Sequence, residues 1–61
     1  MGMNECLGKN ICLELKTGSK YFGILKEIDE SPKGFSWIIL EIKGKTETFA
    51  DTEVLRIEVI E

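Results

Sequence analysis

Apolar and polar residues alternate along most of the chain, and this period of two predicts half-buried β-strands. In the first such stretch, Leu13 and Leu15 alternate with charged residues. Strands are predicted at residues 11–16, 20–28, 35–43, 46–50 and 54–60, after a short helical turn at residues 3–7. The connections are too short for parallel crossovers. We therefore expect one all-β domain, residues 1–61, in which five antiparallel strands form a strongly bent small barrel.

The second predicted strand carries a bend and a break in its alternation. Gly23 lies inside an apolar run, where a glycine indicates a sharp bend or a close backbone approach. Leu25 and Ile28 are three residues apart, so a bulge near Lys26 and Glu27 is needed for both to face inward. At the other end of the sheet, Gly44-Lys45 fits a two-residue hairpin turn that begins with glycine.

The alternation divides the apolar residues between two faces of the sheet. The predicted core face carries Leu13, Leu15, Tyr21, Leu25, Ile38, Leu40, Ile42, Leu55, Ile57 and Val59. The opposite face carries Phe22, Ile24, Trp37, Ile39, Val54 and Ile60. A cluster of large apolar side chains outside a core indicates an interaction surface. We interpret it as a subunit contact. The alternatives are that the amino-terminal turn folds over part of it, or that the bend exchanges which residues face inward.

Composition narrows the classes of function. The chain has 8 basic and 11 acidic residues, a formal charge of −3, which argues against broad electrostatic binding of nucleic acid but leaves room for a local site. It has no histidine, and Cys6 and Cys12 lack the spacing and further ligands of a metal site. No nucleophile has a base beside it. We expect no enzymatic activity, metal, cofactor or small-molecule substrate.

The cysteines and the length bear on location and assembly. A Cys6–Cys12 disulfide is one possibility, but the absence of a secretory signal favours free thiols in a cytoplasmic protein. No apolar run approaches the ~20 residues of a membrane helix. A chain of 61 residues buries little apolar surface, so we expect oligomerisation to supply part of its stability.

Two stretches resemble a known family. Gly18, Tyr21, Gly23, Leu25 and Asp29, preceded by Ile11, Leu13 and Leu15, resemble the first motif of the Sm and Sm-like (Lsm, Hfq-type) proteins. Residues 49–57 resemble the second motif in their apolar frame, although Ala50-Asp51 replaces the basic residue and glycine of the family. Lys33 stands where the family has an asparagine. Other small bent barrels need similar glycines and leucines, so an unrelated barrel stays an alternative.

The resemblance implies a ring of six or seven subunits, in which the fourth strand of one subunit pairs with the fifth strand of the next. The corresponding interface residues are Thr46, Thr48, Phe49, Val54, Arg56, Glu58 and Ile60. One expected contact across this interface is an ion pair between Glu47 and Arg56. Such an edge would add backbone hydrogen bonds between subunits.

The resemblance also implies a site for single-stranded RNA on two loops. The corresponding residues are Lys33, Phe35, Ala50, Asp51 and Thr52. Asp51 would repel phosphate and Ala50 cannot donate a hydrogen bond, so the site is degenerate. Lys33 either contacts phosphate or is a solvated loop lysine, and Phe35 either stacks on a base or closes the core.

Three functions follow from these observations. The first is an Sm-like ring that binds or chaperones single-stranded RNA. The second is a homo-oligomeric scaffold of the same fold whose partner is protein and which binds no RNA. The third is a monomeric adaptor built on an unrelated small barrel, with its outer apolar cluster exposed.

Overall fold

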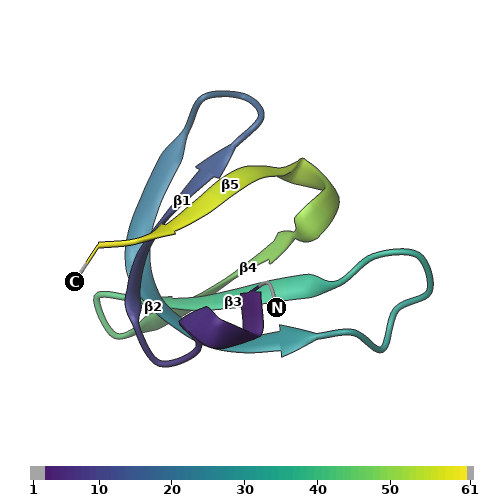
Figure 1. The fold of residues 1–61 in the computed structure, drawn as a ribbon, viewed down its shortest axis with the longest axis horizontal. Helices are drawn as coiled ribbons and strands as arrows, with labels where there is room; N and C mark the ends of the chain where they lie inside the picture. Colours follow the sequence, from purple (N-terminus) through teal and green to yellow (C-terminus); the bar gives the residue numbers. More distant parts are fainter. Residues whose placement is uncertain (1–2, 61) are drawn as a thin grey trace.

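The computed structural model describes residues 3–60, with side chains from residue 5 onward, and they form one antiparallel sheet with two short 3₁₀ turns (Figure 1). In chain order the elements are η1 (Met3–Cys6), β1 (Asn10–Leu15), β2 (Lys20–Asp29), β3 (Trp37–Ile42), β4 (Lys45–Ala50), η2 (Asp51–Glu53) and β5 (Val54–Val59). The all-β class, the five strands and the amino-terminal helical turn are confirmed. None of the described helices is long and apolar enough to cross a membrane.

The strand order is β4-β3-β2-β1-β5, and every neighbouring pair is antiparallel. The sheet curls but does not close, so the predicted barrel is wrong (Figure 1). The reason lies in the connection after β4. The turn η2 directs β5 across the molecule to pair with β1, and the Lys16 N–H donates to the Glu53 carbonyl at 3.0 Å. Within the described residues, β4 and β5 each have a strand neighbour on one side only.

The predicted bend and bulge in β2 are both present. A Cβ atom at position 23 would lie 2.5 Å from the Glu41 carbonyl oxygen and 2.8 Å from Ile42 Cγ1, so only glycine fits. Beyond the bend, Leu25 pairs with Leu40 and Glu27 pairs with Ile39. Lys26 is therefore the extra residue of a bulge, and it returns Ile28 to the inner face.

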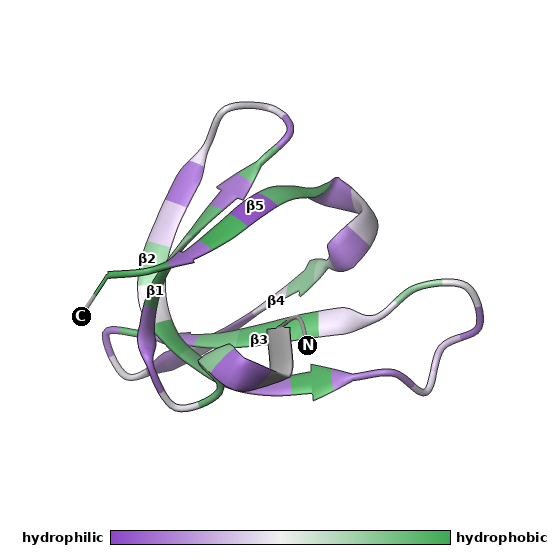
Figure 2. Cartoon of the chain, in the orientation of Figure 1, coloured by the Kyte–Doolittle hydropathy of each residue, from purple (hydrophilic) through white to green (hydrophobic). Residues whose placement is uncertain are grey.

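The core lies on the concave face of the sheet, and β3 contributes hydrophobic residues along most of its length (Figure 2). Its fully buried members are Ile11, Leu13, Leu25, Ile38 and Leu40. Cys6, Leu15, Ile28, Ile42, Phe49, Val54 and Ile57 pack around them. A cluster of five fully buried side chains is a small core even for a chain of this length.

Four core assignments made from the sequence differ from the structure. Val54, predicted to face outward, packs against the core, whereas Leu55, predicted to face inward, is 57% exposed. The cause is a second bulge: Glu14 pairs with Arg56 but Leu15 pairs with Val54, so Leu55 is the extra residue. Tyr21 and Val59 do share the inner face but lie at its margin, 36% and 43% exposed.

The hairpin between β3 and β4 also differs from the prediction by one residue. Ile42 pairs with Lys45, so the two central turn residues are Lys43 and Gly44 rather than Gly44 and Lys45. Their φ angles are 54° and 81°. Two positive φ angles define a type I′ turn, whose twist matches that of the flanking strands.

The outer face carries the predicted apolar side chains apart from Val54. Phe22, Trp37 and Ile60 are 56%, 37% and 52% exposed, and Ile24 and Ile39 are half-buried. The turn η1 does not cover this surface, because it places Cys6 against the core. Among the residues that the structure describes, nothing closes over Phe22 and Ile60 on this surface, which remain more than half exposed. Cys6 and Cys12 are free thiols, as expected.

Gly23→Val is expected to destabilise the fold by at least about 3 kcal/mol, because the new side chain collides with the backbone of β3. Urea unfolding followed by circular dichroism measures the free energy of unfolding. Thr48→Val, an exposed change on β4, is the control and is expected to shift it by less than about 0.5 kcal/mol. A Gly23→Val protein that is as stable as the original would contradict the close approach of β2 and β3.

Candidate assembly edges and nucleic-acid interface

The outer edge of β4 presents unpaired backbone groups. Ile42 and Lys45 close a two-residue turn, so they form a hydrogen-bonded pair, and hydrogen-bonded and non-hydrogen-bonded pairs alternate from there along the two strands. Thr46 and Thr48 fall in non-hydrogen-bonded pairs. Their N–H and C=O groups consequently point away from β3, toward the position that a further strand would occupy. Both residues are exposed and no proline interrupts the strand.

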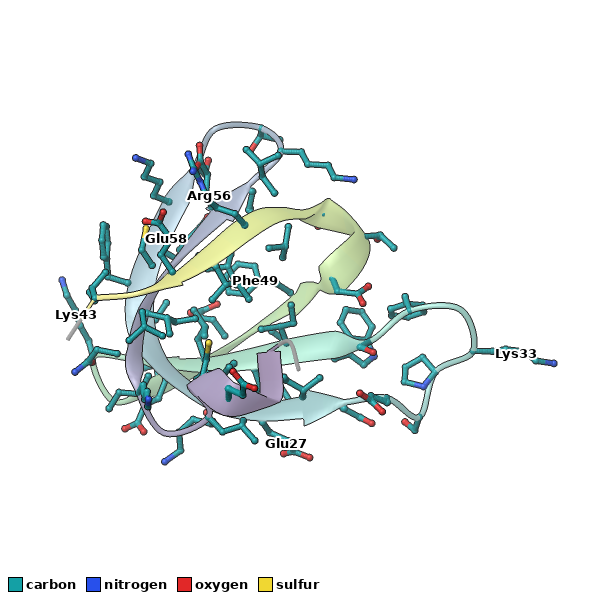
Figure 3. All side chains as sticks on the ribbon, viewed as in Figure 1. Glu27, Lys33, Lys43, Phe49, Arg56 and Glu58 are labelled. Atoms are coloured by element: carbon teal, nitrogen blue, oxygen red, sulfur yellow. The ribbon has the colours of Figure 1, made fainter. Side chains whose placement is uncertain are left out.

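The edge of β5 is the opposite end of the same sheet. Arg56 lies on the outer face and its Nε donates to Glu14 Oε1 at 3.1 Å, while its Nη1 lies 3.8 Å from Glu58 Oε2 (Figure 3). The hydrogen bond to Glu14, with the charges of Glu14 and Glu58, raises the pKa of Arg56. Glu47 pairs with Leu40 on the inner face. The register thus gives no support to a Glu47–Arg56 pair across subunits.

The residues predicted for the subunit interface divide into two groups. Thr46, Thr48, Arg56, Glu58 and Ile60 are exposed on or beside the two edges. Phe49 and Val54 pack against the core of their own chain, and Phe49 points into the molecule (Figure 3). These two side chains contribute first to the fold of the single chain. The exposed members are the ones available to a neighbour.

Four of the five predicted RNA-binding residues lie at one end of the sheet. The Asp51 N–H donates to the Ser36 carbonyl at 2.9 Å, which ties the start of η2 to the end of the β2–β3 loop. Ala50 pairs with Trp37, and Thr52 follows in η2. Phe35 is half-buried, its ring 5.0 Å from that of Trp37 and nearly perpendicular to it.

Lys33 stands apart from the other four. It lies near the tip of the β2–β3 loop and its side chain extends away from the sheet into solvent (Figure 3). No ion pair is formed by Lys33 with any other residue in the described part of the chain. Its ammonium group is free to meet a phosphate that approaches this end of the molecule.

Trp37 belongs to the same end of the sheet, although the sequence assigned it only to the outer apolar cluster. It is 37% exposed, and its strand partners on the outer face are Asp29 and Ala50. Phe35 meets it edge-on and supports its orientation. The sequence did contain a signal that Trp37 belongs to this site. It is a second aromatic residue, two positions after Phe35, at the start of the strand that follows the loop.

Asp29 ends β2 and shapes the loop that follows. Its Oδ1 accepts a hydrogen bond from the Ser31 N–H at 3.0 Å, the geometry of an Asx turn. Hydrogen bonds from the Ser31 backbone and hydroxyl lower the pKa of Asp29. The carboxylate is therefore ionised at neutral pH and has one oxygen that is not used by this backbone bond.

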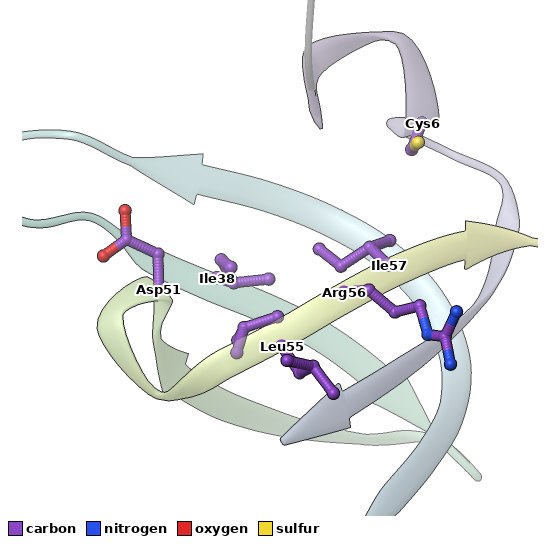
Figure 4. Close-up of a pocket in the computed structure, with 7 residues that line it drawn as sticks. Cys6, Ile38, Asp51, Leu55, Arg56 and Ile57 are labelled. Carbon is purple, nitrogen blue, oxygen red and sulfur yellow. The ribbon is translucent and has the colours of Figure 1, made fainter. Parts of the chain in front are cut away.

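Two grooves flank these features. An inner groove of about 460 Å³ opens between η2, β5 and β3 because the sheet is not closed, with Asp51 at one end and Cys6 near the other (Figure 4). Its apolar lining includes Val54 and Ile57. An outer groove of about 300 Å³ is lined by Phe22, Gly23, Ile24, Ile60, Asn10, Glu41, Lys43 and Gly44.

Binding is the chemistry that this arrangement supports. Within residues 3–60, no three histidine, cysteine, aspartate or glutamate side chains are close enough to hold a metal ion. The described part of the chain also has no buried side-chain polar atom without a partner. What the chain does offer is two free strand edges, exposed aromatic side chains and a free lysine.

The stabilising contribution of the Asp29 carboxylate is expected to disappear in acid. Its folded pKa is lowered, so the contribution is present above the unfolded value of about 3.9 and is lost as the pH falls through the folded pKa. Asp29→Asn should therefore be less stable than the original protein at pH 7, and the difference should shrink below about pH 4. Urea midpoints of both proteins at the two pH values measure it. A difference that does not change with pH would contradict the assignment.

Comparisons with known proteins were made with the family models, the curated proteins and the solved structures. No family model matches the chain, and neither a curated protein nor a solved structure matches it. We therefore infer function from the free edges, the exposed aromatic side chains and the loops of the chain.

Proposed function

We propose that the chain is an Sm-like subunit that assembles into a closed homo-oligomeric ring of six or seven copies and binds single-stranded RNA. The observation that carries the proposal is the strand order, in which β4 and β5 are the two free edges of one sheet. These are the two strands through which the Sm-like family joins its subunits. The motifs around Gly23 and along residues 49–57 support the same assignment.

Head-to-tail pairing of β4 with β5 of a neighbour would satisfy both edges. Thr46 and Thr48 present the outward backbone groups of β4. Within the described residues, the edge of β5 that faces away from β1 pairs with no strand. A contact between two different surfaces closes into a ring when its rotation allows, and otherwise continues as a fibre. Closure leaves no edge exposed, and it supplies the additional burial that a small core needs.

The RNA half of the proposal rests on the end of the sheet where the β2–β3 loop meets η2. Phe35 and Trp37 provide aromatic surface on which a base stacks, and Lys33 provides a cation for phosphate. Asp51 adds negative charge nearby. With a net charge of −3, affinity would come from stacking and few phosphate contacts rather than from a broad basic field. In a ring, each subunit would present the same end to one strand of RNA.

A second candidate function is favoured by the outer groove. Phe22 and Ile60 are more than half exposed there beside Ile24, and exposed apolar side chains of this size mark protein-binding surfaces. A homo-oligomeric scaffold that presents this groove to a protein would use the same edges and no RNA. It predicts assembly without nucleic-acid affinity, whereas the first function requires both.

Assembly is expected to depend on the outward N–H groups of β4. Thr48→Pro removes one such N–H without removing a hydrogen bond to β3, so the protein should fold but lose its oligomeric state. Native mass by multi-angle light scattering measures this, with six or seven copies expected for the original chain.

Thr48→Val, which keeps the N–H group, is the matched variant and should assemble normally. A folded original protein that remains a monomer at high concentration would overturn the ring. A Thr48→Pro protein with an unchanged native mass would place the contact elsewhere than at the edge of β4.

RNA binding is expected to be moderate and to weaken with salt. Fluorescence anisotropy of a labelled, unstructured single strand of about ten nucleotides should show affinity that falls between about 50 and about 200 mM salt. Lys33→Ala should lower the affinity several-fold and reduce the salt slope by about 1. Lys20→Ala, an exposed lysine at the start of β2, should change neither. Absence of binding at the lower salt by an assembled protein would favour the scaffold.

A further inference from the structure

Trp37 and Asp29 form a cross-strand pair. They are directly opposite each other on β3 and β2, with both side chains on the outer face. The Cβ atoms of such a pair are about 5 Å apart. Trp37 is 37% exposed and Asp29 is half-buried. An exposed indole with a carboxylate at its margin is thus a structural consequence of the strand register.

Phe35 restricts the indole further. Its ring approaches that of Trp37 edge-on, with an interplanar angle of 85° and the centroids 5.0 Å apart. This contact takes up part of the Trp37 ring system, and Trp37 keeps 37% of its surface exposed, which is the part that a base would stack on. Asp29 lies opposite Trp37 on the neighbouring strand, so its carboxylate is the group that the edge of a stacked base would meet.

We propose that this pair binds guanine in preference to the other bases. The base stacks on Trp37, and its N1–H and N2–H groups donate hydrogen bonds to the Asp29 carboxylate. The inference rests on the proposed RNA binding and assigns a base preference to it. Asp29 belongs to the first motif, but neither Asp29 nor Trp37 is among the five residues that the resemblance implies for RNA binding.

The preference follows from the donors and acceptors on each base. An ionised carboxylate only accepts hydrogen bonds, and its two oxygens match two adjacent donors. Guanine presents N1–H and N2–H side by side. Adenine and cytosine each present one amino group beside an unprotonated ring nitrogen, and uracil presents one N–H between two carbonyl oxygens. Those lone pairs would face the negative charge of Asp29, so the three bases fit less well.

The turn that follows β2 keeps the carboxylate in place. Asp29 Oδ1 accepts the Ser31 N–H at 3.0 Å, which fixes the side chain while each carboxylate oxygen retains acceptor capacity. Ordering of the carboxylate before the base arrives reduces the entropy cost of binding. No basic side chain forms an ion pair with Asp29 within the described residues.

The test compares four labelled pentanucleotides, UUGUU, UUAUU, UUCUU and UUUUU, by anisotropy with the assembled protein. We expect UUGUU to bind about tenfold more tightly than UUUUU, a discrimination typical of a good bidentate contact. Asp29→Asn should remove most of that ratio, because an amide offers one acceptor and one donor. Its carbonyl oxygen still accepts the Ser31 N–H, so the loop is kept. Glu27→Gln is the matched control, an exposed carboxylate on the same face of β2.

The outcomes separate this inference from the proposed function. Binding of all four strands with equal affinity, or tightest binding of UUUUU, overturns the guanine preference and leaves RNA binding intact. If none of the four strands binds, both the guanine preference and the proposed RNA binding are overturned. Trp37→Leu should weaken all four strands, and a loss confined to UUGUU would contradict the stacking role of Trp37. An unchanged preference in Asp29→Asn would also overturn the assignment.

Discussion

The close approach of β2 to β3 at Gly23 is the constraint on which the rest of the structure depends. The space that a side chain would occupy is taken by the Glu41 carbonyl and the Ile42 side chain. Without a Cβ atom, β2 can bend across β3, and the long strand then contributes to both halves of a curled sheet. Two strands are added on each side, β1 with β5 and β3 with β4. The inner side of this curl holds the hydrophobic core of the described chain.

Two single-residue bulges then decide which side chains face that space. Lys26 is the extra residue in β2, and it lets Leu25 and Ile28 share the inner face. Leu55 is the extra residue in β5, and it turns Val54 inward while its own side chain is exposed. A shift of one residue in a strand moves every later side chain to the other face. The composition of both faces thus depends on two residues that take no part in the pairing.

An open sheet with a small core has consequences for function. Its two edge strands, β4 and β5, each have a free side within the described residues, and the inner groove beside β5 stays accessible. Closure within the chain would hide both features, whereas closure between chains would use them. The assembly edges and the aromatic end also involve different residues, because Thr46 and Thr48 lie on β4 while Trp37 and Asp29 lie on β3 and β2. The proposed assembly and the proposed base stacking would therefore use different side chains.

Local patterns in the sequence determined the five strands, the bend at Gly23, the bulge near Lys26 and the Asx turn at Asp29, because each depends on the geometry of a few consecutive residues. The tertiary structure alone decided three further points. These are the open sheet instead of a barrel, the inward turn of Val54, and the pairing of Trp37 with Asp29. Each depends on which strand lies beside which and in what register, and alternation within one strand carries no information about the residue opposite. The two loops of the candidate site were predicted only through the resemblance to the Sm-like family, and the position of Trp37 opposite Asp29 came from the strand register.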